Sequence, residues 1–274
     1  MGDFKVIKSK KRRTRSSNTK VDNSFLQNFG CYTSTGLEVF SRESVVERVT
    51  SAKEEIKSSE FFRLFTKDLL EKNEDLSSVD IITYGLGNFS QCVSSRYQFA
   101  FILALKDICK GDSLLYDPVF IAEEIEIIKN FNCFIIAENE EAKRKINKKT
   151  LFFLPHCPKQ LLNNLLWKNW TTSLKHCIIV GNSINKIVES HSDRFLKQNL
   201  TYVYHASSFV NEITINNCFK YSDIFNDLSI QWFSEQNISE LNCNISELSL
   251  EPSYKEEDIE FITYSLNDYL SIKQ

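Results

Sequence analysis

Residue types that could bind a ligand gather where short apolar runs of this chain end. The set comprises Gly85, Gly87, Asn88, Ser95, Arg96, Asp117, His156, Cys157, Gly181, Asn182 and Ser183. The runs before them are typical of buried strands, and open α/β sheets bind their ligands outside the carboxyl ends of parallel strands. We therefore predict that one crevice holds these residues.

The segment TYGLGNFS resembles part of a dinucleotide-binding turn. Gly85 would allow the tight bend, and Gly87 would let backbone approach an anion at the following helix N-terminus, where free N–H groups favour negative charge. Ser95 and Arg96 could supplement such a site. However, a serine replaces the third glycine of G-x-G-x-x-G, and Asp117 lies 30 residues after Gly87 instead of about 20. An anion site and a turn with purely structural glycines remain equal alternatives, and both are favoured over a dinucleotide site.

His156 and Cys157 lie between two prolines, Pro155 and Pro158. A cysteine thiolate with a histidine base is a nucleophilic pair, and either side chain could be an axial haem ligand. Adjacent residues of an extended segment point to opposite sides, so these two cannot easily act on each other. A turn in which the prolines stop the strand, His156 bonds backbone and Cys157 packs is favoured. A ligand contact ranks next, and covalent catalysis last.

The composition excludes several classes of protein. The net charge of -3 gives no reason to expect nucleic-acid or membrane binding by the whole chain. No apolar run approaches the roughly 20 residues that span a bilayer, and no secretory signal is visible. The eight cysteines form no C-x-x-C pair, so we predict no metal site and mostly reduced thiols. We expect a cytoplasmic protein, with the nucleus as a second location.

Alternating strand and helix patterns position the candidate residues. Apolar runs predict strands at 79–87, 112–120, 132–139, 150–158 and 175–183, and amphipathic stretches predict helices at 94–109, 121–131, 159–170 and 184–196. Such alternation indicates a Rossmann-like, doubly wound, mainly parallel sheet of about five or six strands with flanking helices. An edge strand at 210–215 and an apolar segment at 223–233 that docks on the domain would complete it.

The remaining segments define the expected domain organisation. Residues 1–24 are basic and have little to bury, which predicts a disordered tail; nuclear targeting or transient nucleic-acid contact are the alternatives. Residues 25–233 would form a single α/β domain, with a helical entry at 38–76 and its core at 79–233. Residues 234–274 are acidic and polar, and we expect a weakly ordered tail with a short terminal helix as an option.

Six segments, taken in order, resemble the sensitivity-to-red-light-reduced (SRR-like) family over about residues 79–233. They are TYGLGNFS, LYDPVF, IIAENEEAKR, LFFLPHCPKQLLNNLLWKNW, IIVGNS and FNDLSIQWF. The resemblance implies a regulatory protein in circadian clock input and, in animals, in control of haem biosynthesis. It implies no catalytic residue. The family's last motif has a histidine where this chain has Gln231, so any chemistry of that histidine would be absent here.

Two functions follow as hypotheses. The first is a regulator that acts through a small ligand or a protein partner at the strand ends, and for which no enzymatic activity is expected. The alternative is a Rossmann-like enzyme, such as an S-adenosylmethionine-dependent methyltransferase or another enzyme with a nucleotide cofactor. Haem, held by Cys157 or His156, is a further candidate ligand. This type of fold hosts many functions, so the site must decide between them.

Overall fold

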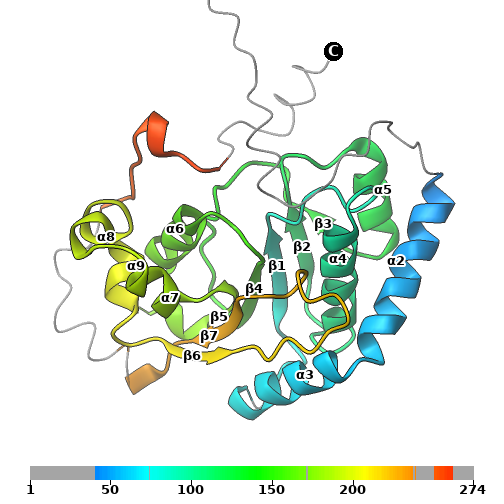
Figure 1. Ribbon diagram of the computed structural model, residues 1–274, viewed down its shortest axis with the longest axis horizontal. Coiled ribbons are helices and arrows are strands. Elements are labelled where there is room, and N and C mark those ends of the chain that lie inside the picture. Colours follow the sequence, from blue (N-terminus) through cyan, green and yellow to red (C-terminus); the bar gives the residue numbers. More distant parts are fainter. Residues whose placement is uncertain (1–40, 74, 171, 237, 239–249, 262–274) are drawn as a thin grey trace, which may run out of the picture. The chain divides into compact units, whose positions relative to one another are not determined.

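One mixed sheet forms the centre of the protein (Figure 1). The computed structural model describes residues 41–73, 75–170, 172–236, 238 and 250–261. The sheet that it describes has the order β3-β2-β1-β4-β5-β7-β6. Its strands are β1 (Asp80–Tyr84), β2 (Ser113–Tyr116), β3 (Phe134–Ile135), β4 (Thr150–Leu154), β5 (Cys177–Asn182), β6 (Asn211–Thr214) and β7 (Leu228–Trp232).

The first five strands are parallel, and helices connect them along the chain except between β3 and β4, where residues 136–149 form a loop. β1 pairs with β2 on one side and with β4 on the other, so the strand order reverses beside β1. This arrangement confirms the predicted doubly wound sheet, and the reversal is the place where such sheets bind ligands. The helices between and after these strands are α4 (Val93–Lys106), α5 (Ala122–Asn130), α6 (Lys159–Asn169), α7 (Ile184–Glu189), α8 (Asp193–Asn199) and α9 (Thr201–Ala206).

The last two strands make the sheet larger than the five or six strands predicted. β6 takes the expected edge position. The segment 223–233, predicted only to dock on the domain, also contains β7, which pairs antiparallel with both β5 and β6. β7 is buried except at its last residue, because it has a neighbour on each side and is covered on both faces.

Within the described residues, two helices precede the sheet, α2 (Arg42–Lys57) and α3 (Glu60–Lys72). Both begin at serine N-caps: Ser41 Oγ accepts the N–H of Ser44, and Ser59 Oγ accepts that of Phe62, each at 3.2 Å. Buried residues of α2 recur at three- and four-residue spacing, which gives the helix one apolar side. They are Val45, Val49, Ala52 and Ile56.

Phenylalanine rings fill the layer between α3, α4 and the sheet. Phe61 of α3 stacks on Phe225 with ring centroids 4.6 Å apart, and Phe65 meets Phe101 of α4 edge-on at 4.9 Å. Sheet residues such as Phe153 belong to the same cluster. A second cluster lies between the other face of the sheet and α6, α7 and α9. The sheet is therefore covered by helices on both faces.

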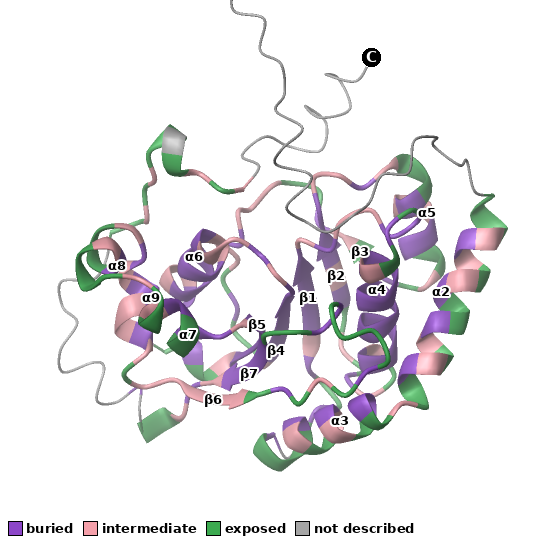
Figure 2. Ribbon diagram, in the orientation of Figure 1, coloured by how far each residue is buried: buried purple, intermediate pink, exposed green. Residues whose placement is uncertain are grey.

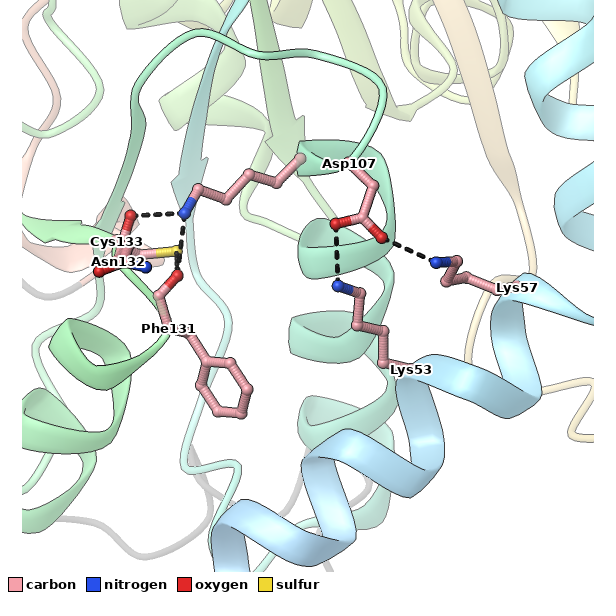
Figure 3. Close-up of polar contacts among 7 residues, drawn as sticks. Lys53, Lys57, Asp107, Phe131, Asn132 and Cys133 are labelled. Atoms are coloured by element: carbon pink, nitrogen blue, oxygen red, sulfur yellow. Dashed lines mark hydrogen bonds and ion pairs between the residues drawn. The ribbon is translucent and has the colours of Figure 1, made fainter.

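Helix α4 is buried along most of its length (Figure 2). Helix α2 packs along it. At the C-terminal end of α4, Lys53 and Lys57 of α2 each place Nζ 2.9 Å from a carboxylate oxygen of Asp107 (Figure 3). The opposite end of α4, at Val93, follows the loop that begins with the Gly-Leu-Gly turn, so α4 connects this loop to the surface that α2 covers.

Parts of the predicted domain organisation lie outside the described residues. These parts are the basic tail at 1–24 and most of the acidic tail at 234–274. Of the latter, residues 234–236, 238 and 250–261 are described. The last of these segments lies against α6, where Gln160 Nε2 donates to the carbonyl of Asp258 at 2.6 Å. None of the helices in the described residues has the length and apolar character that a membrane span requires.

Candidate functional site

The Gly-Leu-Gly turn after β1 requires both of its glycines. Gly85 has φ 71° and Gly87 has φ 77°, in the left-handed region that side chains disfavour. A Cβ on Gly85 would collide with Cys157 Sγ, and one on Gly87 would lie 2.8 Å from Ser95 Oγ. Asn88 completes the turn, because its Oδ1 accepts the hydroxyl of Ser90 at 2.8 Å.

A buried carboxylate at the end of β2 occupies the turn from inside. Asp117 Oδ2 accepts the N–H of Gly87 at 2.7 Å, and Oδ1 accepts that of Val119 at 2.9 Å. Burial raises the pKa of Asp117, whereas these two backbone hydrogen bonds lower it. In a dinucleotide turn the N–H at Gly87 would face a phosphate. Here the N–H donates to the chain's own Asp117, so this donor of the turn already has a partner inside the chain.

A second buried acid, Glu124 of α5, holds the same loop. Its Oε1 accepts the N–H of Ser90 at 2.8 Å, and its Oε2 accepts that of Ile121 at 3.2 Å. Burial raises the pKa of Glu124 to about 7, and the charge of Asp117 acts in the same direction. Sequence reasoning missed this residue. The sequence did contain a signal for this role of Glu124. The residue lies in the first turn of the predicted helix 121–131, where acids cap backbone N–H groups.

Cys157 is a packing residue that joins three strand ends. Its thiol donates to the carbonyl of Tyr84 at 3.2 Å, and its own carbonyl accepts from Asn182 Nδ2 at 2.9 Å. Burial and the charge of Asp117 raise the pKa of the thiol. A nucleophile and a thiolate haem ligand both require the ionised sulfur. The surroundings of Cys157 therefore fit neither role.

His156 lies at the surface of the same turn, beside a charged pair. It has φ 52°, and its Nε2 lies 3.4 Å from the carbonyl of Ile224. Asp227, with φ 55°, precedes β7 and accepts from Lys186 Nζ at 2.7 Å. The Lys186 hydrogen bond lowers the pKa of Asp227, and the charge of His156 adds to this. Lys186 and Asp227 were not among the predicted site residues, although Asp227 belongs to the FNDLSIQWF segment.

The residues at the end of β5 are held by the sheet. A Cβ on Gly181 would lie 2.9 Å from the carbonyl oxygen of Leu154, so the close strand pairing requires glycine. Ser183 caps α7 by accepting the N–H of Lys186 at 3.0 Å. Gln231 of β7 is buried, and its Nε2 donates to the carbonyl of Asn182 at 3.0 Å. Gln231 therefore supports the site from the neighbouring strand.

Three further side chains join the end of β1 to the loop after β3. They are Tyr84, Glu140 and Arg144, and sequence reasoning did not assign them to the site. The Tyr84 hydroxyl donates to Glu140 Oε2 at 2.7 Å. Arg144 binds both oxygens of Glu140, at 2.8 Å from Nε and 2.6 Å from Nη2. Burial and the charge of Glu140 raise the pKa of Tyr84. Such a bidentate ion pair fixes geometry strongly, so it holds this loop against the site.

Arg96 lies apart from the hydrogen bonds that join the other predicted site residues. It lies in the first part of α4, is only 9% exposed, and its Nη1 has no hydrogen-bond partner in the described part of the chain. Burial lowers the pKa of Arg96, and the charge of Arg48 in α2 lowers it further. The N-cap of α4, Cys92, makes no side-chain cap to the helix.

A small cavity of about 10 Å³ lies between the ends of β4 and β5 and the start of α6, with Cys157 and Asn182 in its lining. That volume is about what one water requires. The structure thus brings Gly85, Gly87, Asp117, Cys157 and Asn182 together through hydrogen bonds and close packing, and we call this group the filled junction. Within the described residues, no group of three or more His, Cys, Asp or Glu could hold a metal ion.

Known proteins are similar in sequence to this region. A family model described as the SRR1 domain matches residues 53–232. An SRR1-like protein of Mus musculus is 36% identical over 136 residues, which are 48% of this chain and 55% of that protein. The SRR1-like protein of Drosophila melanogaster is 29% identical, over 58% of this chain and 56% of that protein. Protein SENSITIVITY TO RED LIGHT REDUCED 1 of Arabidopsis thaliana is 31% identical, over 50% of this chain and 54% of that protein. The chain spans about half the length of these relatives.

Solved structures resemble the chain more distantly. A mutant of MtNAS superposes with a TM-score of 0.36 at 10% identity, over 70% of this chain and 74% of its own. The mitomycin 7-O-methyltransferase MmcR superposes with a TM-score of 0.35 at 10% identity, over 72% and 62%. Likeness at this level supports no inference about activity.

Proposed function

The chain belongs to the SRR1 domain family, and from that premise we propose that it is a regulatory protein of circadian clock input and haem biosynthesis. It acts, in this proposal, by binding a protein partner at the carboxyl edge of its sheet. The rhythm and haem roles are those that the family resemblance implies. The name of the Arabidopsis thaliana relative, with its reduced sensitivity to red light, supports a role in light input.

The filled junction at the strand ends is the observation that carries this proposal. The thiol of Cys157 and the N–H of Gly87 are already hydrogen-bonded inside the chain, and the cavity beside Cys157 has room for about one water. A small cofactor would have to break these bonds. A protein partner would instead contact the side chains that reach the surface of the edge, His156, Lys186 and Asp227.

Rescue of cells that lack the mouse relative tests the proposal. The wild-type chain should restore rhythm period and haem content. The double variant His156→Ala/Asp227→Ala should fail to restore them at equal abundance and an unchanged melting temperature, because it removes the edge side chains and leaves the junction intact. Equal rescue by both chains, or no rescue by the folded wild-type chain, would contradict the proposal.

Arg96 favours a second candidate function, an enzyme with a nucleotide or S-adenosylmethionine cofactor. A buried guanidinium near the start of a helix without a side-chain cap is suited to an anionic group. At 100 times its dissociation constant a ligand stabilises a protein by about 2.7 kcal/mol. A thermal shift with S-adenosylmethionine, nicotinamide or adenine nucleotides, or phosphate that vanishes in Arg96→Gln would establish this function. No shift at millimolar concentration would remove it.

A further inference from the structure

Residues 250–261 lie along α6 through contacts that resemble peptide recognition. We propose that the polar side of α6, formed by Gln160, Asn163 and Asn164, is a docking site for an extended acidic segment with a central tyrosine. The chain's own residues 250–261 occupy the site here, and a partner segment of the same chemistry displaces them. The inference rests on the proposed function, because it identifies where and how a partner is recognised.

Tyr254 is the anchor of the bound segment. Its hydroxyl accepts from Asn163 Nδ2 at 3.0 Å and donates to Asn164 Oδ1 at 2.8 Å, and the carbonyl of Gln160 lies 3.2 Å away. Its ring meets that of Phe261 edge-on at 6.0 Å. Burial raises the pKa of Tyr254, so the neutral phenol is the bound form. Polar groups from two successive turns of one helix therefore converge on a single hydroxyl.

The two asparagines are oriented by the domain, independently of the segment. Asn163 Oδ1 accepts the N–H groups of Tyr202 and Val203 in α9, at 2.9 and 3.2 Å. Asn164 Nδ2 donates to the carbonyl of Glu141 at 3.0 Å. These bonds leave the Asn163 amide group and the Asn164 oxygen directed at the tyrosine. A preformed donor and acceptor of this kind is what specific recognition of a hydroxyl requires.

Backbone contacts and charges complete the recognition. Tyr202 donates to the carbonyl of Leu250 at 2.7 Å, and Gln160 Nε2 donates to that of Asp258 at 2.6 Å. Lys143 binds Glu251 with Nζ 2.8 Å from Oε1, and Lys159 pairs with Glu260. The positive charges of Lys143 and Lys159 favour an acidic segment. The hydrogen bonds to backbone carbonyls of the segment do not depend on which side chains lie at those positions.

The chain's own segment fills the site incompletely. The Leu250 side chain is 79% exposed. Beside it, a cavity of about 200 Å³ lies between Asn163, residues 198–199 and 201–202, and residues 250–253. Pro252 and Ser253 are too small to fill it, and amide and hydroxyl groups of α8 and α9 line it. A partner segment with a larger polar side chain just before its tyrosine would fit better, and so would displace the internal one.

Peptide binding to the full chain tests the inference. The probe is a fluorescent peptide with the sequence of residues 250–261, followed by fluorescence anisotropy. The variant Tyr254→Ala should bind it at least about tenfold more tightly than wild type does, because a tethered competitor acts at an effective concentration near millimolar. Adding Asn164→Ala should abolish binding. A peptide that carries glutamine in place of Ser253 should bind more tightly than the peptide with the natural sequence.

A second variant guards against loss of folding in Tyr254→Ala. Glu251→Gln/Glu260→Gln weakens the internal segment without changing its buried anchor, and should raise peptide affinity in low salt. Equal or absent binding to wild type and to both folded variants would overturn the inference. The outcome is independent of the rescue assay: peptide binding without rescue would refute the proposed function alone, and rescue without peptide binding would refute only the docking site.

Discussion

At the scale of residues, two buried acids take the place that a bound anion has in a nucleotide-binding turn. Asp117 and Glu124 hold the N–H groups of Gly87 and Ser90, and a side chain at either glycine would disrupt the junction. Sequence reasoning found Asp117 and both glycines because their types and positions after strands are distinctive. It missed Glu124, Glu140 and Arg144, because charged residues in a helix or loop look solvated until a partner far along the chain is known.

The variant Gly87→Ala should lower the free energy of unfolding by about 2 kcal/mol, since a left-handed alanine costs roughly 1–2 kcal/mol and the new Cβ crowds Ser95. Urea unfolding measures this. The double variant Gly87→Ala/Ser95→Ala should recover only the part due to crowding. A stable Gly87→Ala chain would mean that the turn adopts another conformation.

Glu124 should make stability fall as the pH rises. Its pKa in the folded chain, about 7, lies above the ordinary 4.5, so its contribution is complete below pH 4.5 and is lost as the pH rises through 7. Each unit of difference between the folded and unfolded pKa is worth about 1.4 kcal/mol, so the loss of unfolding free energy is roughly 3 kcal/mol by pH 8. The difference in unfolding free energy between wild type and Glu124→Gln, followed from pH 4.5 to 8, should show this slope. A constant difference would contradict the assignment.

At the scale of elements, burial on both faces made the parallel strands and their helices predictable, because such strands read as continuous apolar runs. The strand β7 was not recognised in segment 223–233. Its pairing with β5, in which Ile178 faces Trp232, joins residues far apart along the chain and leaves no local signal. The same reason hid Lys186 beside Asp227. The sequence therefore indicated the edge where the site lies, but not that its side chains satisfy one another.

Apolar packing, and not surface charge, should hold the entry helices in place. Phe61→Ala should cost about 3–5 kcal/mol, because the ring is fully buried and stacked on Phe225. Asp107→Ala, which removes both partly exposed ion pairs between α2 and α4, should cost less than about 1 kcal/mol. Chemical denaturation of the two variants side by side gives the comparison. A larger loss in Asp107→Ala would reverse this ranking.

At the scale of the whole molecule, an α/β sheet with the topology of a nucleotide-binding fold has a filled junction at its ligand edge and charged side chains around it. On the proposed function, that surface and the polar side of α6 are where partners bind. Helix α6 begins directly after Pro158, so a segment docked on it lies next to the edge. Recognition at both places would use surfaces of the sheet's carboxyl side without opening its core.

Amide hydrogen exchange at Gly87 and Ser90, measured by NMR in the free chain and with cofactors added, tests the central claim most directly. Both amides are bonded to buried carboxylates, so we predict exchange slowed at least about 100-fold in the free chain. Millimolar S-adenosylmethionine or nucleotides should leave these rates unchanged. Rapid exchange in the free chain that slows when one cofactor is added would show that the turn is an open cofactor site, and would contradict the account.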